Sequence, residues 1–218
     1  MTSCINKTFR DLSKNMNIMK KLQFLTIIGL LIGGTSGCNN PNGQTADNSV
    51  EQAQGVNDTT AMVNQNDVDF AVKAADAGLA EIELGKLAQE KASDPRIRDF
   101  AKKMVNDHQE ANDELMTIAS RYQITLPPVI SEDHVDKQHS LREKTGVGFD
   151  NDYMDMMVRD HDKVVTLFED ASEDVRNSDL QAFASKILPI LKKHYEEAKA
   201  IRDSINPMDT TTIQRIIP

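Results

Sequence analysis

Four ionisable residues occupy positions where a helical repeat would otherwise place an apolar core residue: Glu81, His108, His161 and His194. Each stands in a run of apolar residues spaced three or four positions apart, the pattern of a helix with one buried stripe. A buried ionisable group is costly unless it is paired, hydrogen-bonded or bound to a metal. We therefore expect the four side chains to point into one helical bundle and to form a site.

The chemistry of these side chains favours a metal ion. Imidazole nitrogen and carboxylate oxygen suit Zn, Fe, Mn or Cu at a site without thiols, and both cysteines, Cys4 and Cys38, lie near the start of the chain. Glu197 lies three residues after His194 on nearly the same helical face, so it is a candidate fifth group. The predicted site for a mononuclear transition metal or a small ligand comprises Glu81, His108, His161, His194 and Glu197.

Counting along the helices predicts that these residues lie at one level. At 1.5 Å per residue, His108 lies roughly 21 Å and Glu81 roughly 18 Å from the turn between their helices. His161 and His194 each lie roughly 24 Å from the turn near Asn177. The members of each pair are therefore level, and all four groups fall near the middle of the bundle.

Neighbouring residues could modify such a site. Asp107 and Asp160 each precede a core histidine and are more plausible as outer partners of the ligands, or as hydrogen-bond acceptors between helices, than as ligands themselves. Met104 and Met157 lie one turn before His108 and His161, where a thioether would favour Cu(I). Core packing is the simpler explanation for both methionines, because methionine fills irregular gaps.

The same residues also permit a function without a metal. A neutral layer of histidine and glutamate can satisfy itself by hydrogen bonding and fix the register of the helices. The domain would then be a structural or interaction module. The sequence does not decide whether the protein is an enzyme, because it shows neither an open coordination position nor substrate access.

The apolar spacing predicts an all-α fold with helices over residues 67–92, 95–122, 149–176 and 178–206. Asp94 and Pro95 form an N-cap followed by a first-turn proline, and residues 178–181 have the form of a capping box. A longer polar connection separates the second and third helices. Two helical hairpins joined by this crossover form an antiparallel four-helix bundle over residues 67–206, which resembles ferritin-like folds.

The first part of the chain has the pattern of a targeting signal. The basic pair Lys20–Lys21 precedes an apolar run over residues 22–32 and small residues before Cys38. We expect residues 1–37 to be a signal peptide, with Met19 as an alternative start. A cysteine at this place resembles the lipobox of bacterial lipoproteins, so lipidation at Cys38 is expected; an ordinary cleaved secretory signal is the alternative.

A lipidated cysteine predicts a cell-envelope lipoprotein that faces the periplasm or belongs to the outer membrane, with the membrane as its partner. Residues 38–66 are polar and predict a flexible tether, and residues 207–218 form a short tail. A net charge of −9 argues against nucleic acid as a partner, and the absence of tryptophan weakens proposals of base or sugar stacking.

Three segments resemble a known family. They are Glu-Ile-Glu-Leu-Gly-Lys-Leu-Ala over residues 81–88, Phe-Ala-Lys-Lys-Met-Val-Asn-Asp-His over 100–108, and the Leu188–Pro189 pair before His194. They resemble the exported bacterial ferritin-like family called domain of unknown function 4142, along about Val68 to Ile205. The resemblance implies a helical fold and a periplasmic or outer-membrane location, and it implies no reaction. Because the chain lacks the Glu-x-x-His motifs of di-iron bundles, dinuclear iron oxidation is not expected.

Overall fold

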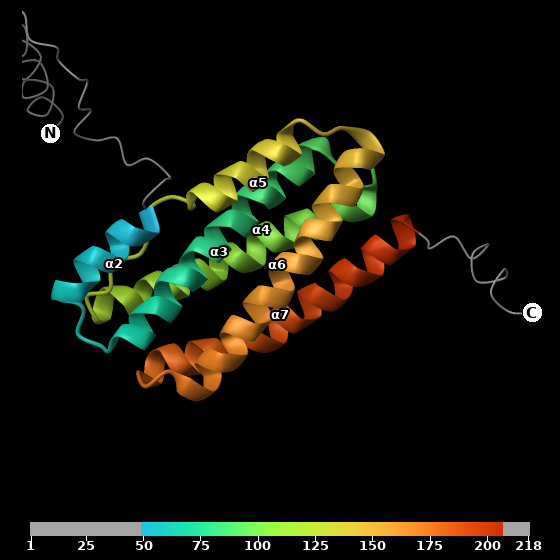
Figure 1. The fold of residues 1–218 in the computed structure, drawn as a ribbon. Coiled ribbons are helices and arrows are strands. Elements are labelled where there is room, and N and C mark those ends of the chain that lie inside the picture. Colours follow the sequence, from blue (N-terminus) through green and yellow to red (C-terminus); the bar gives the residue numbers. More distant parts are fainter. Residues whose placement is uncertain (1–48, 207–218) are drawn as a thin grey trace, which may run out of the picture. The chain divides into compact units, whose positions relative to one another are not determined.

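The computed structural model describes residues 49–206, which contain six helices and no strand (Figure 1). The helices are α2 (Ser49–Thr60), α3 (Gln65–Lys91), α4 (Pro95–Arg121), α5 (Glu132–Arg142), α6 (Gly146–Asp174) and α7 (Ser178–Ile205). The predicted signal peptide, the predicted lipidation site Cys38, the start of the predicted tether and the predicted tail over 207–218 lie outside the described residues. Within the described range, no helix is both long enough and apolar enough to cross a membrane.

The four long helices form two hairpins. Helix α3 packs along α4 and α6 packs along α7, and each pair is joined by only three residues (Figure 1). Helix α4 also contacts α7, and α3 contacts α6, so the hairpins enclose a common interior. The predicted all-helical bundle is therefore confirmed at the level of its class.

Helix starts follow the capping rules, with one correction. Asp94 caps α4 by accepting a hydrogen bond from the Arg96 N–H, and Pro95 is the first helical residue, as predicted. The capping box expected to begin at Ser178 is wrong, because Asn177 caps α7 instead. Asn177 lies one residue before Ser178, and its side-chain oxygen accepts hydrogen bonds from the backbone N–H groups of Asp179 and Leu180.

Helix α2 lies inside the segment predicted to be a tether over residues 38–66, so the folded domain begins earlier than expected. The Asn57 side chain exchanges two hydrogen bonds with the backbone of Thr125, at 2.9 and 2.7 Å, and Ala53 is buried. These contacts fix α2 against the loop after α4. The sequence did not predict α2 because the helix is polar: it is held mostly by hydrogen bonds and not by an apolar stripe.

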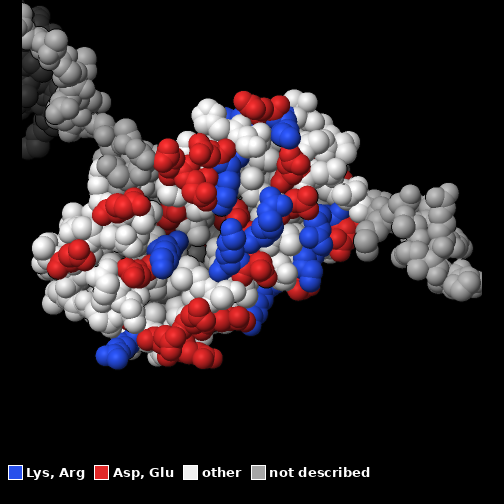
Figure 2. Space-filling model, viewed as in Figure 1, with Lys and Arg blue, Asp and Glu red and all other residues white. Residues whose placement is uncertain are grey.

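Helix α5 lies within the predicted crossover and packs against α3 and α6. Asp76 of α3 accepts hydrogen bonds from the backbone N–H and the hydroxyl of Ser131, which precedes α5, and Leu141 is buried at the other end. The crossover is therefore an ordered cover over one side of the bundle. On the face seen in Figure 2, acidic and basic side chains are interspersed, with no broad basic patch.

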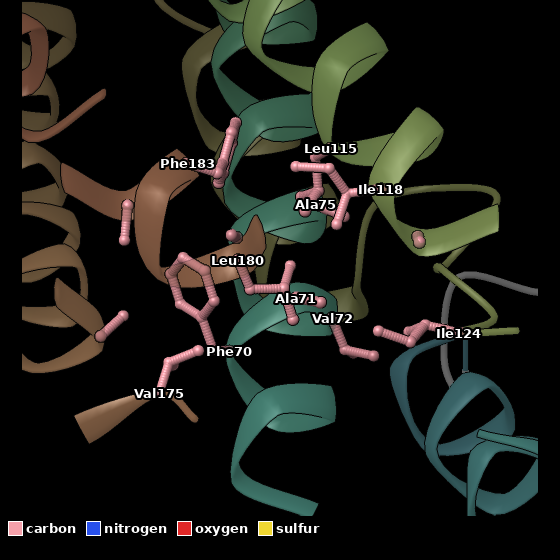
Figure 3. Close-up of a cluster of buried hydrophobic side chains, with 14 of the residues drawn as sticks. Phe70, Ala71, Val72, Ala75, Leu115, Ile118, Ile124, Val175, Leu180 and Phe183 are labelled. Carbon is pink, nitrogen blue, oxygen red and sulfur yellow. The ribbon is translucent and has the colours of Figure 1, made fainter. Parts of the chain in front are cut away.

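Two apolar clusters fill the interior on either side of mid-bundle. One includes Phe70, Leu180 and Phe183, which Figure 3 shows close together. The ring of Phe70 also meets that of Phe168 edge to face, with the ring centroids 5.1 Å apart. The other contains Met104 and Met157, both fully buried, which supports the interpretation of these methionines as core packing. The level between the two clusters is where the stripes carry their ionisable residues.

Candidate metal centre

Three helices each place one imidazole at the middle of the bundle. His108 comes from α4, His161 from α6 and His194 from α7, and the three ring centroids lie 5.6–5.9 Å apart. Each ring offers one nitrogen to a common centre, and these three nitrogens all lie within 4.8 Å of one another. We call these residues the three-histidine cluster. Their convergence follows from the apolar stripe of each helix, in which the histidine takes a core position.

The cluster is buried, which decides the charge of its rings. The exposed fractions of His108, His161 and His194 are 7%, 1% and 1%. Burial lowers the pKa of His161 to about 4, with His194 contributing in the same direction, and the Met157 carbonyl opposes the change. Burial also lowers the pKa of His108 well below its usual range, and lowers that of His194 against the opposing effect of Asp107. All three rings are therefore neutral at pH 7, the state that a metal requires.

In two of the rings, one nitrogen is hydrogen-bonded and the other is not. The Nδ1–H of His161 donates to the Met157 carbonyl at 2.9 Å, and the Nε2–H of His194 donates to the Asp107 carboxylate at 2.8 Å. Metal-binding histidines typically donate their second N–H to a carbonyl or carboxylate in this way. Within residues 49–206, the remaining nitrogens, Nε2 of His161 and Nδ1 of His194, have no hydrogen-bond partner, and the same holds for Nε2 of His108.

Glu81 lies beside the cluster and outside the set of converging nitrogens. Its Oε1 is 3.7 Å from Nδ1 of His161, the nitrogen whose N–H donates to the Met157 carbonyl. Burial raises the pKa of Glu81 to about 8, Asp160 adds to the increase and Lys137 opposes it, so the carboxyl group is neutral at pH 7. Its Oε2 is buried and has no hydrogen-bond partner in the described part of the chain. This geometry makes Glu81 an outer partner of His161 in this conformation.

Glu197 is not brought into the cluster. It forms an ion pair with Lys103 of α4, and its side chain is 38% exposed. One helical turn beyond His194, the long side chain of Glu197 reaches the surface, where a lysine of the neighbouring helix attracts it. Asp160 likewise pairs with Lys137 of α5. Both aspartates therefore accept a hydrogen bond from another helix, as expected, and Asp107 accepts its bond from a histidine of the cluster.

Tyr153 is a member of this region that the sequence did not reveal. It lies eight residues before His161 on α6, is fully buried, and its hydroxyl has no partner within the described range. Burial raises its pKa well above the usual range, and Glu81 adds to the increase. A tyrosine in an apolar stripe resembles any aromatic core residue, so only its missing hydrogen bond marks it.

A surface cavity of about 330 Å³ between α4 and α7 reaches the edge of the cluster. His194 and its partner Asp107 both line it, as does Pro189 in the interior of α7. Proline has no backbone N–H, so it interrupts the hydrogen bonding of the helix at this wall. The cavity therefore brings the surface of the domain close to His194.

The cluster has the composition of a three-ligand metal site. Bonds of 2.0–2.1 Å from a tetrahedral ion to three nitrogens require those nitrogens to lie about 3.3 Å apart. The separation of up to 4.8 Å would therefore have to shrink by at most about 1.5 Å, within reach of small side-chain rotations. Three protein ligands leave the fourth position for water or a small ligand.

Comparison with known proteins adds a family and no activity. No curated protein and no solved structure matches the chain. A family match extends over residues 52–201, from within α2 to near the end of α7, and includes the whole three-histidine cluster. The chain therefore belongs to the family described as Domain of unknown function (DUF4142).

Proposed function

We propose that the domain binds a single transition-metal ion through the three-histidine cluster. The observation that carries this proposal is that three buried imidazoles each offer a nitrogen within 4.8 Å of the other two, and that each ring has a buried nitrogen without a hydrogen-bond partner in the described residues. Buried polar atoms in folded proteins are almost always satisfied. A metal ion would satisfy all three nitrogens at once.

The donor set favours Zn, Fe, Mn or Cu in a mononuclear site. Neutral imidazole binds each of these ions, and residues 49–206 contain no cysteine to select a softer ligand sphere. Asp107 and the Met157 carbonyl would hold His194 and His161 in the tautomers that ligation needs. Glu81 would lie next to His161 without binding the metal itself. We also propose that the four long helices are arranged as in ferritin-like proteins.

The alternative is a layer that only fixes helix register. Two observations favour it. His161 and His194 each have one ring nitrogen that is already hydrogen-bonded, and a neutral Glu81 does not require a counter-ion. A purely structural layer does not explain why each of the three rings has a buried nitrogen without a hydrogen-bond partner in the described residues, whereas metal binding would explain it. Metal content distinguishes the two functions.

The decisive experiment measures metal by plasma mass spectrometry in purified protein, before and after reconstitution with Zn, Fe, Mn and Cu. The wild type should hold close to one ion per chain. The double variant His108→Ala/His161→Ala should hold none, while the control His139→Ala, which removes an exposed histidine of α5, should match the wild type. A wild type that binds no ion, or a double variant that binds as well as the wild type, would exclude the site.

We also propose that the domain is attached to the cell envelope through a lipid on Cys38. The basic pair Lys20–Lys21, the apolar run over 22–32 and the small residues before Cys38 support this location. Metabolic labelling with a fatty acid in a bacterial host should mark the wild type and leave Cys38→Ala unlabelled. A secreted, unlabelled wild type would instead indicate an ordinary signal peptide.

A further inference from the structure

A second cavity, of about 260 Å³, opens on the side of the bundle covered by α5. Its aliphatic walls come from α3 and α6 and include Ala77, Ala80, Val164 and Leu167. Glu81 also lines it. Glu81 is only 3% exposed, and its buried Oε2 has no hydrogen-bond partner in the described part of the chain. The cavity therefore combines aliphatic walls with one unsatisfied polar group.

The acidic residues around this cavity are already paired. Asp76 accepts hydrogen bonds from Ser131 and lies 3.0 Å from Nδ1 of His134. Asp133 and Asp160 both pair with the same lysine of α5, Lys137, at 3.0 and 3.4 Å. A cationic ligand would have to displace one of these pairs.

Two lysines that line the cavity are not paired in this way. Lys73 of α3 and Lys163 of α6 make no hydrogen bond or ion pair with any residue between 49 and 206, although Lys163 helps to lower the pKa of Asp133. They are two unpaired cations in a chain with a net charge of −9. Their ammonium groups are available to an anion.

We infer that this cavity binds a small organic anion, specifically a short aliphatic carboxylate. Lys73 and Lys163 would contact the carboxylate group, and the alkyl part would lie on the aliphatic walls near Glu81. The walls favour an organic anion over a bare inorganic one, since burial of methylene groups against aliphatic side chains is favourable. The inference does not rest on the proposed metal site.

Saturation-transfer difference NMR on the metal-free protein tests the inference, with butyrate as the probe. Metal-free protein is used because a carboxylate could otherwise bind to an ion in the three-histidine cluster. Butyrate should bind the wild type, and 1-butanol, which has a similar alkyl chain without the charge, should not compete. Inorganic phosphate should compete at least tenfold more weakly than butyrate.

Variants locate the binding. Lys73→Met/Lys163→Met should weaken butyrate binding at least tenfold, whereas the charge-matched control Lys102→Met/Lys193→Met should bind as the wild type does. Glu81→Leu should also weaken binding, while His108→Ala should not. No binding to the wild type, equal binding to both lysine double variants, or phosphate binding as tight as that of butyrate would overturn the inference. None of these outcomes depends on whether the cluster binds a metal.

Discussion

The domain contains two sets of buried polar side chains that differ in how completely they are hydrogen-bonded. Each member of the first set accepts at least two hydrogen bonds from loop residues; these capping aspartates are Asp67, Asp76 and Asp150. Each member of the second set has a buried nitrogen or oxygen with no partner in the described part of the chain; this central layer is Glu81, His108, His161 and His194. The comparison indicates that the aspartates maintain the fold, and that residues 49–206 leave polar atoms of the layer unsatisfied.

Two of the capping aspartates, Asp67 and Asp150, connect each hairpin to the loop of the other. Asp67, near the start of α3, accepts from the backbone N–H groups of the α6–α7 loop, and Asp150, near the start of α6, accepts from those of the α3–α4 loop. The two connections are reciprocal. They fix the relative position of the hairpins and thereby the height at which the histidines meet.

The largest expected effect comes from removing a capping aspartate. Asp150→Ala leaves the N–H groups of Ser93 and Asp94 without their acceptor, which should lower the free energy of unfolding by about 4 kcal/mol. Urea denaturation measures this change. The control Asp152→Ala, on the exposed side of the same helix, should change it by no more than about 0.5 kcal/mol. A loss below about 1 kcal/mol for Asp150→Ala would remove the distinction between the two sets.

The next effect concerns the pH dependence that Glu81 gives the metal-free protein. Its pKa is raised to about 8 on folding, so folding favours the protonated form. The stability that it contributes is complete below pH about 4.5 and is lost as the pH rises through about 8. Glu81→Gln removes this dependence, so its advantage over the wild type should grow between these pH values to on the order of a few kcal/mol.

Denaturation of both proteins across pH 5–9 measures the difference. The subtraction is needed because the neutral histidines act in the opposite direction: their pKa values are lowered, so their stability contribution is lost as the pH falls through about 6.5 toward 4. Parallel curves for wild type and Glu81→Gln would show that Glu81 does not titrate abnormally.

A smaller effect is expected at Asp107, the layer's outer hydrogen-bond partner. Asp107→Asn removes the negative charge that the Nε2–H of His194 faces, which should weaken metal affinity by about 10- to 100-fold. A competition titration with a chromophoric chelator measures the affinity. Asp113→Asn, an exposed change on the same helix, is the control. Equal affinities for the two variants would exclude Asp107 from the site.

Much of the central layer was predictable from spacing alone. His108, His161 and His194 each replace an apolar residue in a regular stripe, and the helical period then determines where they point. The same period could not place Glu197, because a lysine on another helix draws its long side chain to the surface. Nor could it reveal Tyr153, whose ring is an ordinary core residue and whose hydroxyl is the unusual part.

The helices also differ in how well the sequence predicted them. The long helices were predictable because their burial is apolar and periodic. Helices α2 and α5 were not, because polar contacts anchor them: Asn57 to the backbone of Thr125, and Asp76 to Ser131. Such contacts join residues 55 or more positions apart, and a local pattern carries no information about them.

The smallest effect is the sharpest contrast with Asp150→Ala. His161→Leu replaces a buried polar ring with an apolar side chain, and such a replacement is often neutral or stabilising. The free energy of unfolding of the metal-free variant should lie within about 1 kcal/mol of the wild type, while metal binding is lost. A loss of several kcal/mol would mean that His161 serves the fold in the way that the capping aspartates do.

The central claim is that the three-histidine cluster holds a metal, and X-ray absorption at the edge of the reconstituted ion tests it most directly. The predicted spectrum shows imidazole scattering from three histidines, with a first shell at about 2.0–2.1 Å for zinc. A first shell of oxygen atoms without imidazole scattering, or the same spectrum from His108→Ala/His161→Ala, would contradict the claim.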